Sequence, residues 1–411
     1  QSAGAAPALE GRLGQHAHGV GYHHRPGGPA VPFWMPPEAV IGAGALEALG
    51  PALAGDGVGK VLVVTDEVLV GAGLVQPVLD ILAGAGLDHA VFAGVMPNPT
   101  VDAVEAGAAM AEAEGCDAVV SVGGGSPHDA AKAIAIVAAH GGPVQRYEGL
   151  DKIPGPVLPL FAVNTTAGTA SEMTRFSIIT DEARKVKMAI VDARCTPKLA
   201  INDTMMHLGM PPGLTAATGM DALTHAVEAY VSTASTPVTD ASALHAVKLV
   251  SAYLRRAVSD GQDLQARDMM AHAEFLAGMA FNSAGLGFVH AMAHQLGGFY
   301  NLPHGVCNAV LLPAVQRANA REVPALYIDI AEAMDFRPGE DSALAVELVL
   351  GAIKGLSADI GIPRNLAELG VRREDFDTLA ENAMQDACGA TNPVPFTRDE
   401  VVQLFEDAYS Q

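Results

Sequence analysis

The sequence predicts an α/β fold, with an N-terminal domain built on a parallel sheet and an all-helical domain after it. Between residues 60 and 165, short β-branched runs alternate with longer alanine-rich segments, which is the pattern of βαβ units. From about residue 210, long segments with helical periodicity replace this alternation. A chain of 411 residues is also longer than one that packs around a single hydrophobic core, and this length suits two domains of about 200 residues each.

The predicted sheet strands are short apolar runs rich in β-branched residues. They are Val61 to Thr65, His89 to Ala93, Ala118 to Val122 and Leu158 to Val163. The intervening segments Leu74 to Ala85 and Thr100 to Glu114 predict helices. Because strands that alternate with helices are joined by crossover connections, we expect a parallel sheet covered on both faces.

The second half predicts long helices, namely Leu214 to Val231, Pro237 to Ala257 and Gln265 to Phe281. The run Met210 to Gly213 (MPPG) marks the boundary before them. We therefore expect an α/β domain over residues 32–209 and a helical domain over residues 210–411. Residues 1–31 are rich in Ala, Gly and Pro, which predicts a flexible N-terminal extension. Its four histidines could bind a metal ion, although a flexible tail fits this composition better.

The composition excludes several classes of partner. A formal net charge of −22 argues against nucleic acid, because a phosphate backbone requires a basic surface. No apolar run approaches the roughly 18 residues of a membrane span, so we expect no membrane partner. The acidity does not exclude a small anionic cofactor held in a local pocket.

The cysteines indicate a reducing compartment. Cys116, Cys195, Cys307 and Cys388 are far apart and form no C-x-x-C pair, so buried free thiols fit better than disulfides or a thiolate zinc site. No basic region followed by an apolar run is visible at the N-terminus, which would mark a signal peptide. We therefore expect a cytoplasmic protein.

The strongest local motif is the glycine-rich run Val122 to Asp129 (VGGGSPHD), directly after a predicted strand. Three glycines let the backbone turn sharply and approach a ligand closely. We expect Ser126 as the helix N-cap, Pro127 at the first helical position and Asp129 completing the capping pattern. Amides at such a helix start bind phosphate. An ordinary strand-to-helix turn would carry the same glycines, and the run is not G-x-G-x-x-G.

Two further polar groups follow predicted strands. The run Asn164 to Glu172 (NTTAGTASE) could hold phosphate or ribose hydroxyls, or simply cap a helix. Asp66 follows the first strand, where a carboxylate would bind the ribose 2′-hydroxyl of NAD and repel the 2′-phosphate of NADP. Asp66 would equally serve as an N-cap of the next helix. Polar loops at the carboxyl ends of parallel strands match the usual ligand crevice of open α/β sheets.

The helical half carries candidate metal ligands at helical spacing. Asp221 and His225 stand at i and i+4, His290 and His294 repeat that spacing, and His304 follows. One carboxylate with imidazoles suits a divalent transition ion such as Fe²⁺ or Zn²⁺. A lone helical histidine is more often an ordinary core or surface residue, but two such pairs in apolar helices would be costly without a partner.

These motifs together resemble the iron-containing alcohol dehydrogenase family. The resemblance rests on the runs Gly123 to Asp129, Thr165 to Thr169, Gly219 to His225, Val289 to His304 and Asp386 to Pro393, in this order. It covers the chain from about residue 32 to the end, and is closest to lactaldehyde reductases and bacterial NAD-dependent methanol and ethanol dehydrogenases. It implies a Rossmann-like, dinucleotide-binding first domain and a metal- and substrate-binding helical domain.

The resemblance assigns roles position by position. The implied metal ligands are Asp221, His225, His290 and His304, with His294 beside the metal and near the nicotinamide. The implied cofactor residues are Asp66, Asn98, Gly124, Gly125, Ser126, Asp129, Thr165, Thr166, Thr169, Thr174 and Lys187. The implied substrate pocket contains Phe176, Phe281 and Cys388.

The expected activity is reversible hydride transfer between NAD(H) and short-chain primary alcohols or aldehydes. Fe²⁺, or alternatively Zn²⁺, would polarise the substrate oxygen, and His294 would relay the hydroxyl proton. Alternatively, His294 only shapes the pocket while ribose and water move the proton. A homodimer or larger homo-oligomer is expected.

Several other functions stay open on the residues alone. A related polyol oxidoreductase, such as a glycerol dehydrogenase or lactaldehyde reductase, would use the same fold, and a dehydroquinate synthase would recycle NAD in a lyase reaction. The small number of arginines disfavours a phosphorylated substrate. A metal-dependent hydrolase would leave the glycine loop and Asp66 unexplained, and a metabolite-binding protein would leave the metal ligands unexplained.

Overall fold

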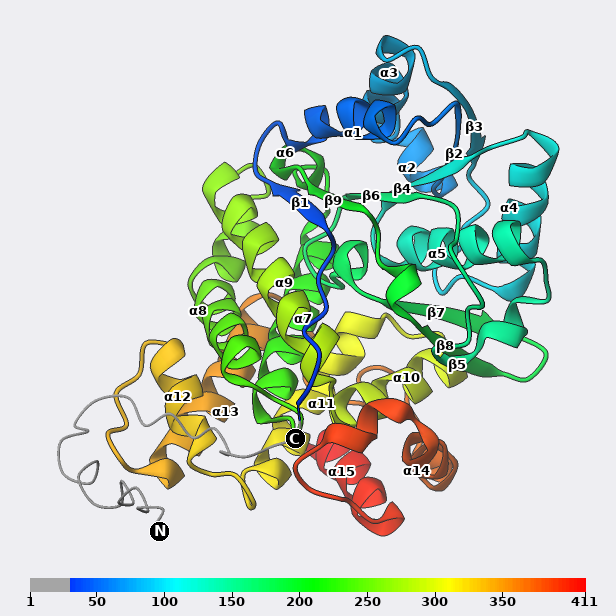
Figure 1. Cartoon of the computed structure of the whole chain (residues 1–411). Coiled ribbons are helices and arrows are strands. Elements are labelled where there is room, and N and C mark those ends of the chain that lie inside the picture. Colours follow the sequence, from blue (N-terminus) through cyan, green and yellow to red (C-terminus); the bar gives the residue numbers. More distant parts are fainter. Residues whose placement is uncertain (1–29) are drawn as a thin grey trace, which may run out of the picture.

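The computed structural model describes residues 30–411, so the predicted N-terminal extension lies outside the described residues up to residue 29. Figure 1 shows an α/β half, coloured blue to green, beside a helical half, coloured green to red. The predicted fold class is confirmed: a six-stranded parallel sheet comes first, and helices make up the rest.

The parallel sheet has the strand order β1-β9-β6-β4-β2-β3. Its strands are β1 (Glu38–Ile41), β2 (Lys60–Val64), β3 (Asp88–Phe92), β4 (Ala118–Gly123), β6 (Leu160–Asn164) and β9 (Leu199–Asn202). The four strands expected from the sequence are present, each within two residues of its expected ends. Strands β1 and β9 were not expected, because four residues each are too few to show a period.

Helices cover both faces of this sheet, as expected. They are α1 (Leu49–Gly55), α2 (Glu67–Gly71), α3 (Gln76–Gly84), α4 (Val101–Ala113) and α5 (Gly125–His140). Alternate strand residues point to opposite faces, so Val61 and Val63 pack with α1 and α3, while Leu62 and Val64 pack with α4 and α5. Figure 1 shows these two pairs of helices on either side of the sheet.

A second, three-stranded sheet lies beside α5 and was not expected from the sequence. Its order is β5-β8-β7, and its strands are β5 (Gly149–Leu150), β7 (Phe176–Asp181) and β8 (Val186–Val191). Strands β7 and β8 pair antiparallel through a short turn. Phe176 begins β7 and Lys187 is the second residue of β8, and this hairpin lies between α5 and α10 (Figure 1).

The helical half packs around one large apolar core. Its helices are α6 (Thr204–His207), α7 (Pro212–Val231), α8 (Pro237–Ser259), α9 (Leu264–Ala284), α10 (Phe288–Tyr300), α11 (His304–Asn319), α12 (Leu326–Ala333), α13 (Ser342–Asp359), α14 (Phe376–Gln385) and α15 (Arg398–Ser410). Helices α7 and α9 are buried along most of their length. Among the described residues, no single helix is long and apolar enough to cross a membrane, and only α9 with α10 passes as a pair, bent by 103°.

The start of α5 corrects one expectation. Helix α5 begins at Gly125 with Gly124 as its N-cap, two residues before the predicted cap Ser126. Ser126 therefore lies inside the first turn, and Pro127 follows it. The reason is that glycine can itself occupy the N-cap position, so the serine side chain is not needed there.

Candidate active site between the sheet edge and the helical half

Three neighbouring strands end at the same edge of the main sheet. Strands β2, β4 and β6 are adjacent and parallel, so their carboxyl ends lie side by side. Asp66 follows β2, the Gly124–Ser126 loop follows β4, and Thr165 follows β6. Most of the predicted cofactor residues therefore lie along one edge, which is where open α/β sheets bind ligands.

The two loops after β4 and β6 close tightly on each other. The Thr165 amide donates to the Gly123 carbonyl at 2.9 Å. A Cβ added to Gly124 would lie 2.9 Å from Thr166 Oγ1, and one added to Gly125 would lie 2.9 Å from Thr169 Cγ2. Larger residues would force the loops apart, so the two glycines are what allows this close approach.

A chain of polar contacts links the glycine loop to the small sheet. The backbone amide of Asn98 donates to Ser126 Oγ at 3.3 Å, and Lys187 Nζ donates to the side-chain oxygen Oδ1 of Asn98 at 2.7 Å. Burial lowers the pKa of the Lys187 amine. Asn98 has a φ of 59°, a left-handed conformation that asparagine tolerates better than most residues.

Three other predicted cofactor residues have protein partners. Asp66 Oδ1 accepts from the backbone amide of Leu69 at 2.8 Å, so Asp66 is the N-cap of α2, which was the alternative role expected for it. Asp129 Oδ1 accepts from the Ser171 hydroxyl at 2.6 Å, and burial raises the pKa of the Asp129 carboxyl. Lys132 Nζ donates to Thr174 Oγ1 at 3.3 Å.

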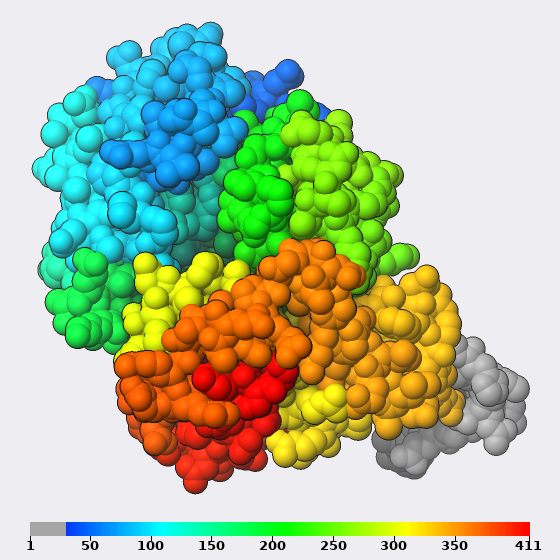
Figure 2. Space-filling view, turned by 180° about the vertical axis from the view of Figure 1, so that it is seen from behind, coloured from blue at the N-terminus to red at the C-terminus, as the bar shows by residue number. Residues whose placement is uncertain are grey.

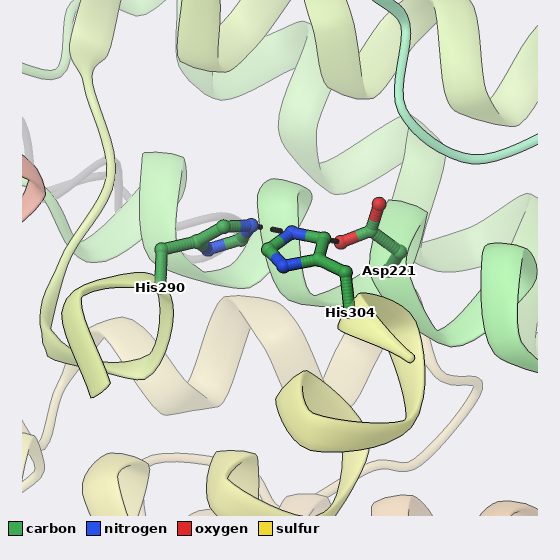
Figure 3. Close-up of side chains that lie close together, drawn as sticks. All are labelled: Asp221, His290 and His304. Carbon is green, nitrogen blue, oxygen red and sulfur yellow. Dashed lines mark ion pairs between the residues drawn. The ribbon is translucent and has the colours of Figure 1, made fainter. Parts of the chain in front are cut away.

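Three predicted metal ligands converge from three helices. One ligand atom each of Asp221 (α7), His290 (α10) and His304 (α11) lies within 4.8 Å of the others. Asp221 Oδ1 is 3.6 Å from His290 Nε2 and 3.5 Å from His304 Nε2. Figure 3 shows the three side chains pointing towards one another. Seen from behind, the surface is hollowed where the cyan part of the α/β half faces the yellow helices (Figure 2).

His225, the fourth predicted ligand, lies beside this trio without being part of it. Its Nε2 is 3.7 Å from Asp221 Oδ1, and its ring stacks on His290 with centroids 4.6 Å apart. The His225 ring also stacks on the ring of Phe281, with centroids 4.3 Å apart. The ring centroids of Phe176 and Phe281 are 6.2 Å apart, so two of the three predicted pocket residues lie close together, and Phe281 is the one that contacts His225.

The charges in this cluster favour binding a cation. Burial would raise the pKa of Asp221, but the imidazoles around it lower that pKa well below its usual range. Burial lowers the pKa of His225 to about 4 and that of His304 well below its usual value. The carboxylate is therefore charged and these two imidazoles are neutral, which is the form that coordinates a metal ion. Burial would lower the pKa of His290, but Asp221 and Glu228 raise it to about 9, so an ion would displace one proton from this ring.

His294 has a different neighbourhood from the other histidines. Its Nδ1 is 2.8 Å from Asp386 Oδ2, and its ring stacks on His304 with centroids 5.4 Å apart. Cys388, the third predicted pocket residue, lies beside this pair in the 3-10 helix η6 (Ala387–Thr391). Burial would raise the pKa of Asp386, but His294 lowers it overall.

Comparison with known proteins identifies the family. The protein-family model for iron-containing alcohol dehydrogenases matches residues 36–204, and the family model for the C-terminal part of these enzymes matches residues 215–409. The chain belongs to the iron-containing alcohol dehydrogenase family. It is 51% identical to alcohol dehydrogenase 4 of Schizosaccharomyces pombe, over 92% of this chain and 89% of that protein.

Two further relatives span nearly the whole enzyme. An NAD-dependent methanol dehydrogenase of Bacillus methanolicus is 45% identical over 92% of this chain and 99% of its own. The crystal structure of a 1,3-propanediol oxidoreductase superimposes with a TM-score of 0.91, at 47% identity over 93% of this chain and 100% of that one. The chain is thus an alcohol dehydrogenase by family, and its α/β and helical halves have the architecture of such an enzyme.

The donor set of this alcohol dehydrogenase fits the divalent ion that its family implies. One carboxylate oxygen and imidazole nitrogens are ordinary ligands of Fe²⁺ and Zn²⁺. The Nδ1 atom of His290 is held by Glu228 Oε2 at 2.6 Å, which leaves Nε2 facing Asp221. Glu228 is itself fixed by the Val289 amide, 2.7 Å from its Oε1. Such outer carboxylates orient metal-binding histidines.

Sequence reasoning assigned no role to three residues that hold predicted site residues. Glu228 contacts His290, Asn308 Nδ2 donates to Asp221 Oδ1 at 2.7 Å, and Asp386 contacts His294. A signal for two of them was present. Glu228 is seven residues after Asp221, and Asn308 is four after His304, so each shares a helix face with a candidate ligand. Asp386 stands in the run Asp386 to Pro393 that carries the family resemblance, but its contact with His294 had no signal, because the two residues are 92 positions apart.

Proposed function

We propose that this alcohol dehydrogenase interconverts short-chain primary alcohols and aldehydes with NAD(H) and Fe²⁺. The observation that carries the proposal is the convergence of Asp221, His290 and His304 on one point. The same molecule has two loops at the sheet edge that approach each other closely at Gly124 and Gly125. Zn²⁺ is the alternative ion, because the donor set accepts either. A lactaldehyde reductase-like or glycerol dehydrogenase-like polyol oxidoreductase is the alternative activity.

The proposed ligands of the ion are Asp221, His225, His290 and His304, with His225 moving slightly to join the other three. When bound, the nicotinamide ring exchanges the hydride and the ion polarises the substrate oxygen. Phe281 stacks on His225, and Phe176 lies beside Phe281, so the two rings would exclude water from the apolar end of the substrate. Short alkyl chains fit such an aromatic wall, which supports a small apolar alcohol as substrate.

His294 is the proposed proton acceptor. Asp386 Oδ2 lies 2.8 Å from its Nδ1 and accepts the Nδ1–H, so Nε2 is the nitrogen that can take the hydroxyl proton. The Asp386 carboxylate also stabilises the imidazolium that forms. His294 is 14% exposed, so it can pass the proton on to solvent.

The proposed cofactor site uses the loops at the sheet edge. Gly124, Gly125 and Ser126 present helix α5 amides to phosphate. The remaining proposed contacts come from the carboxyl ends of β2 and β6 and from the hairpin, namely Asp66, Asn98, Asp129, Thr165, Thr166, Thr169, Thr174 and Lys187. The similarity to an NAD-dependent methanol dehydrogenase supports NAD as the cofactor.

The carboxylate of Asp66 is the proposed reason for NAD over NADP. Only its Oδ1 is used to cap α2, at 2.8 Å from the Leu69 amide. In Asp66→Ser, a hydroxyl still caps the helix but no longer repels a 2′-phosphate. We expect the ratio of kcat/KM for NAD over NADP to fall at least about tenfold, which corresponds to about 1.4 kcal/mol. An unchanged ratio would place the selectivity elsewhere.

Metal add-back tests the function as a whole. The protein is stripped of metal with a chelator, supplied with Fe²⁺ or Zn²⁺ separately, and assayed for NADH formation with ethanol, methanol and 1,3-propanediol. We expect one ion to restore activity, and His290→Ala to abolish it. No NADH formation with either ion, across the alcohols, would reject the proposed activity and leave the family assignment standing.

Localisation and assembly are proposed as well. All four cysteines are free thiols, which supports the cytoplasm as the compartment. We propose a homodimer or a larger homo-oligomer on the family resemblance, and size-exclusion chromatography with light scattering tests it.

A further inference from the structure

A second cluster of ligand-type side chains lies beside the proposed metal centre. His294, Asp386 and Cys388 each offer one ligand atom, and these atoms lie within 4.8 Å of one another. None of them belongs to the cluster of Asp221, His225, His290 and His304. Helix α10 carries His294 one turn after His290, and the other two stand at the start of η6.

We propose that His294, Asp386 and Cys388 form a second cation site, for a sulfur-binding divalent ion such as Zn²⁺. An ion there would occupy the proposed substrate pocket together with the ion of the first site. The binding itself does not depend on the activity proposed above.

The three side chains are arranged to receive an ion with small movements. Asp386 Oδ1 accepts from the Cys388 amide at 2.9 Å, which leaves Oδ2 directed to His294 Nδ1 at 2.8 Å. Zinc binds nitrogen and oxygen at about 2.0 to 2.2 Å and sulfur at about 2.3 Å, so tetrahedral ligands stand about 3.3 to 3.6 Å apart. The His294–Asp386 pair would open by about half an ångström, and the ion would replace the proton between them.

The donor set distinguishes the two sites chemically. One thiolate, one carboxylate and one imidazole suit Zn²⁺, and a water would complete four-coordination because His294 and Asp386 are 14% and 16% exposed. The first cluster contains oxygen and nitrogen donors and no sulfur.

A cysteine nucleophile is the other chemistry that these residue types suggest. Burial first, and then the nearby Asp386 and Glu228, raise the pKa of the Cys388 thiol well above its usual range. The free thiol is therefore un-ionised at neutral pH and a poor nucleophile. A metal ion displaces the thiol proton as it binds, so the same surroundings do not prevent coordination.

Occupation of this site has a functional consequence. The ion would take His294 Nδ1 and Asp386 Oδ2 out of their mutual contact and would cover Cys388 in the pocket. If His294 accepts the substrate proton as proposed, Zn²⁺ beyond the first equivalent inhibits the enzyme while the first ion stays bound.

Cobalt titration tests the binding. The full-length protein, stripped of metal, is titrated with Co²⁺ under anaerobic conditions, and bound ions per chain are measured with the absorption spectrum. We expect two Co²⁺ per chain, one of them with a sulfur-to-cobalt charge-transfer band in the near ultraviolet. Because the first site has no sulfur ligand, this band reports only the second site. A single ion per chain without the band would overturn the proposal.

Matched variants locate the band. Cys388→Ser should lose the band and one ion, whereas Cys307→Ser, at a buried thiol of α11, should keep both. His290→Ala should lose the first ion and keep the band. A band that survives Cys388→Ser would overturn the proposal even if the His290 variant fails to fold.

Inhibition is measured separately. With the first ion in place, the Zn²⁺ concentration that halves the initial rate should rise at least about tenfold in Cys388→Ser, relative to its own zinc-free rate. Cobalt binding without this shift would overturn the inhibitory consequence and leave the site. An enzyme inactive on every alcohol would reject the proposed function, while the cobalt band would still report the second site.

Discussion

The imidazole of His290 lies between two carboxylates, and this arrangement determines which of its nitrogens faces the proposed ion. Glu228 holds Nδ1 at 2.6 Å, and Asp221 lies 3.6 Å from Nε2. Burial alone would lower the pKa of His290, but the two carboxylates raise it to about 9 in the absence of an ion. Single side chains behind the ligands therefore set the geometry and charge of the ligands themselves.

Glu228→Gln should weaken metal binding about 10- to 100-fold. The amide would present a donor to His290 Nδ1, which favours the tautomer with the proton on Nε2, where the ion should bind. Chelator competition under anaerobic conditions measures the affinity. Glu381→Gln, at an exposed carboxylate of α14, is the matched control and should have no effect. Equal affinities in the two variants would contradict the orienting role.

Asp386→Asn should lower kcat about 10²-fold or more with a much smaller change in KM. The amide keeps the size of the side chain but removes the charge that stabilises the His294 imidazolium, 2.8 Å away. His294→Ala should in addition change the pH–rate profile, because the side chain proposed to take the hydroxyl proton is lost. Steady-state alcohol oxidation from pH 5 to 10 measures both, and an unchanged pH–rate profile in His294→Ala would reject the proton relay.

At the level of elements, the site depends on two helices that meet at very close range. Asp221 and Glu228 lie on one face of α7, and His304 begins α11, which packs across it. A Cβ added to Gly305 would lie 2.1 Å from the Ala217 carbonyl oxygen of α7. The glycine after the ligand is thus what lets α11 bring His304 within 3.5 Å of Asp221.

Gly305→Ala should therefore destabilise the protein by about 1 to 3 kcal/mol, because the added methyl group overpacks two backbones. It should also weaken metal binding, since α11 carries His304. Gly298→Ala is the control within the neighbouring helix α10, where nothing lies within 4 Å of the added Cβ. That change should be neutral or stabilise by about 0.5 to 1 kcal/mol. Urea unfolding compares the two, and equal stabilities would show that α11 relaxes without cost.

On the scale of the whole molecule, a buried polar cluster joins the two halves. Asn164, at the end of β6, donates to Glu274 of α9 at 3.0 Å, and Glu274 accepts from the Ala170 amide at 2.9 Å. Burial and the neighbouring Glu172 raise the pKa of Glu274 well above its usual range. This cluster lies directly behind the loop that holds the proposed cofactor residues Thr165 to Thr169, so it fixes that loop against the helical half.

The Glu274 proton makes stability depend on pH. In the unfolded chain Glu274 titrates near its ordinary value of 4.5, but the folded protein keeps the proton to a higher pH. Between the two values the folded state binds more protons, so the free energy of unfolding falls as pH rises, by at most about 1.4 kcal/mol per pH unit.

Glu172→Gln should reduce this fall. The substitution removes the neighbouring negative charge, and the side-chain amide of the glutamine can donate a hydrogen bond to Glu274. The pKa of Glu274 in the folded protein therefore moves towards its usual value. Urea unfolding at several pH values between 4.5 and 8 measures the slope for wild type and variant. Glu182→Gln, in the turn between β7 and β8, is the control. Identical slopes in the wild type and Glu172→Gln would show that the carboxyl pair does not control stability.

The sequence by itself determined the fold class, the family and the positions of the candidate ligands. Strand runs such as Val61 to Thr65 and the i, i+4 pair of Asp221 and His225 are local patterns. Local patterns can be recognised from the sequence alone, because they involve only residues that are close in the chain. The four-residue strands β1 and β9 and the cap of α5 were not predictable in this way, because neighbouring chain segments decide them.

Only the tertiary structure decided which side chains act together. It brought Asp221, His290 and His304 to one point, left His225 just beside them, and placed Asp386 against His294 across 92 residues. Helical spacing fixes the face on which a residue lies, but not the helix that this face meets. The packing of α7, α10 and α11 around one apolar core decides that, because burial of their apolar faces sets how the helices cross.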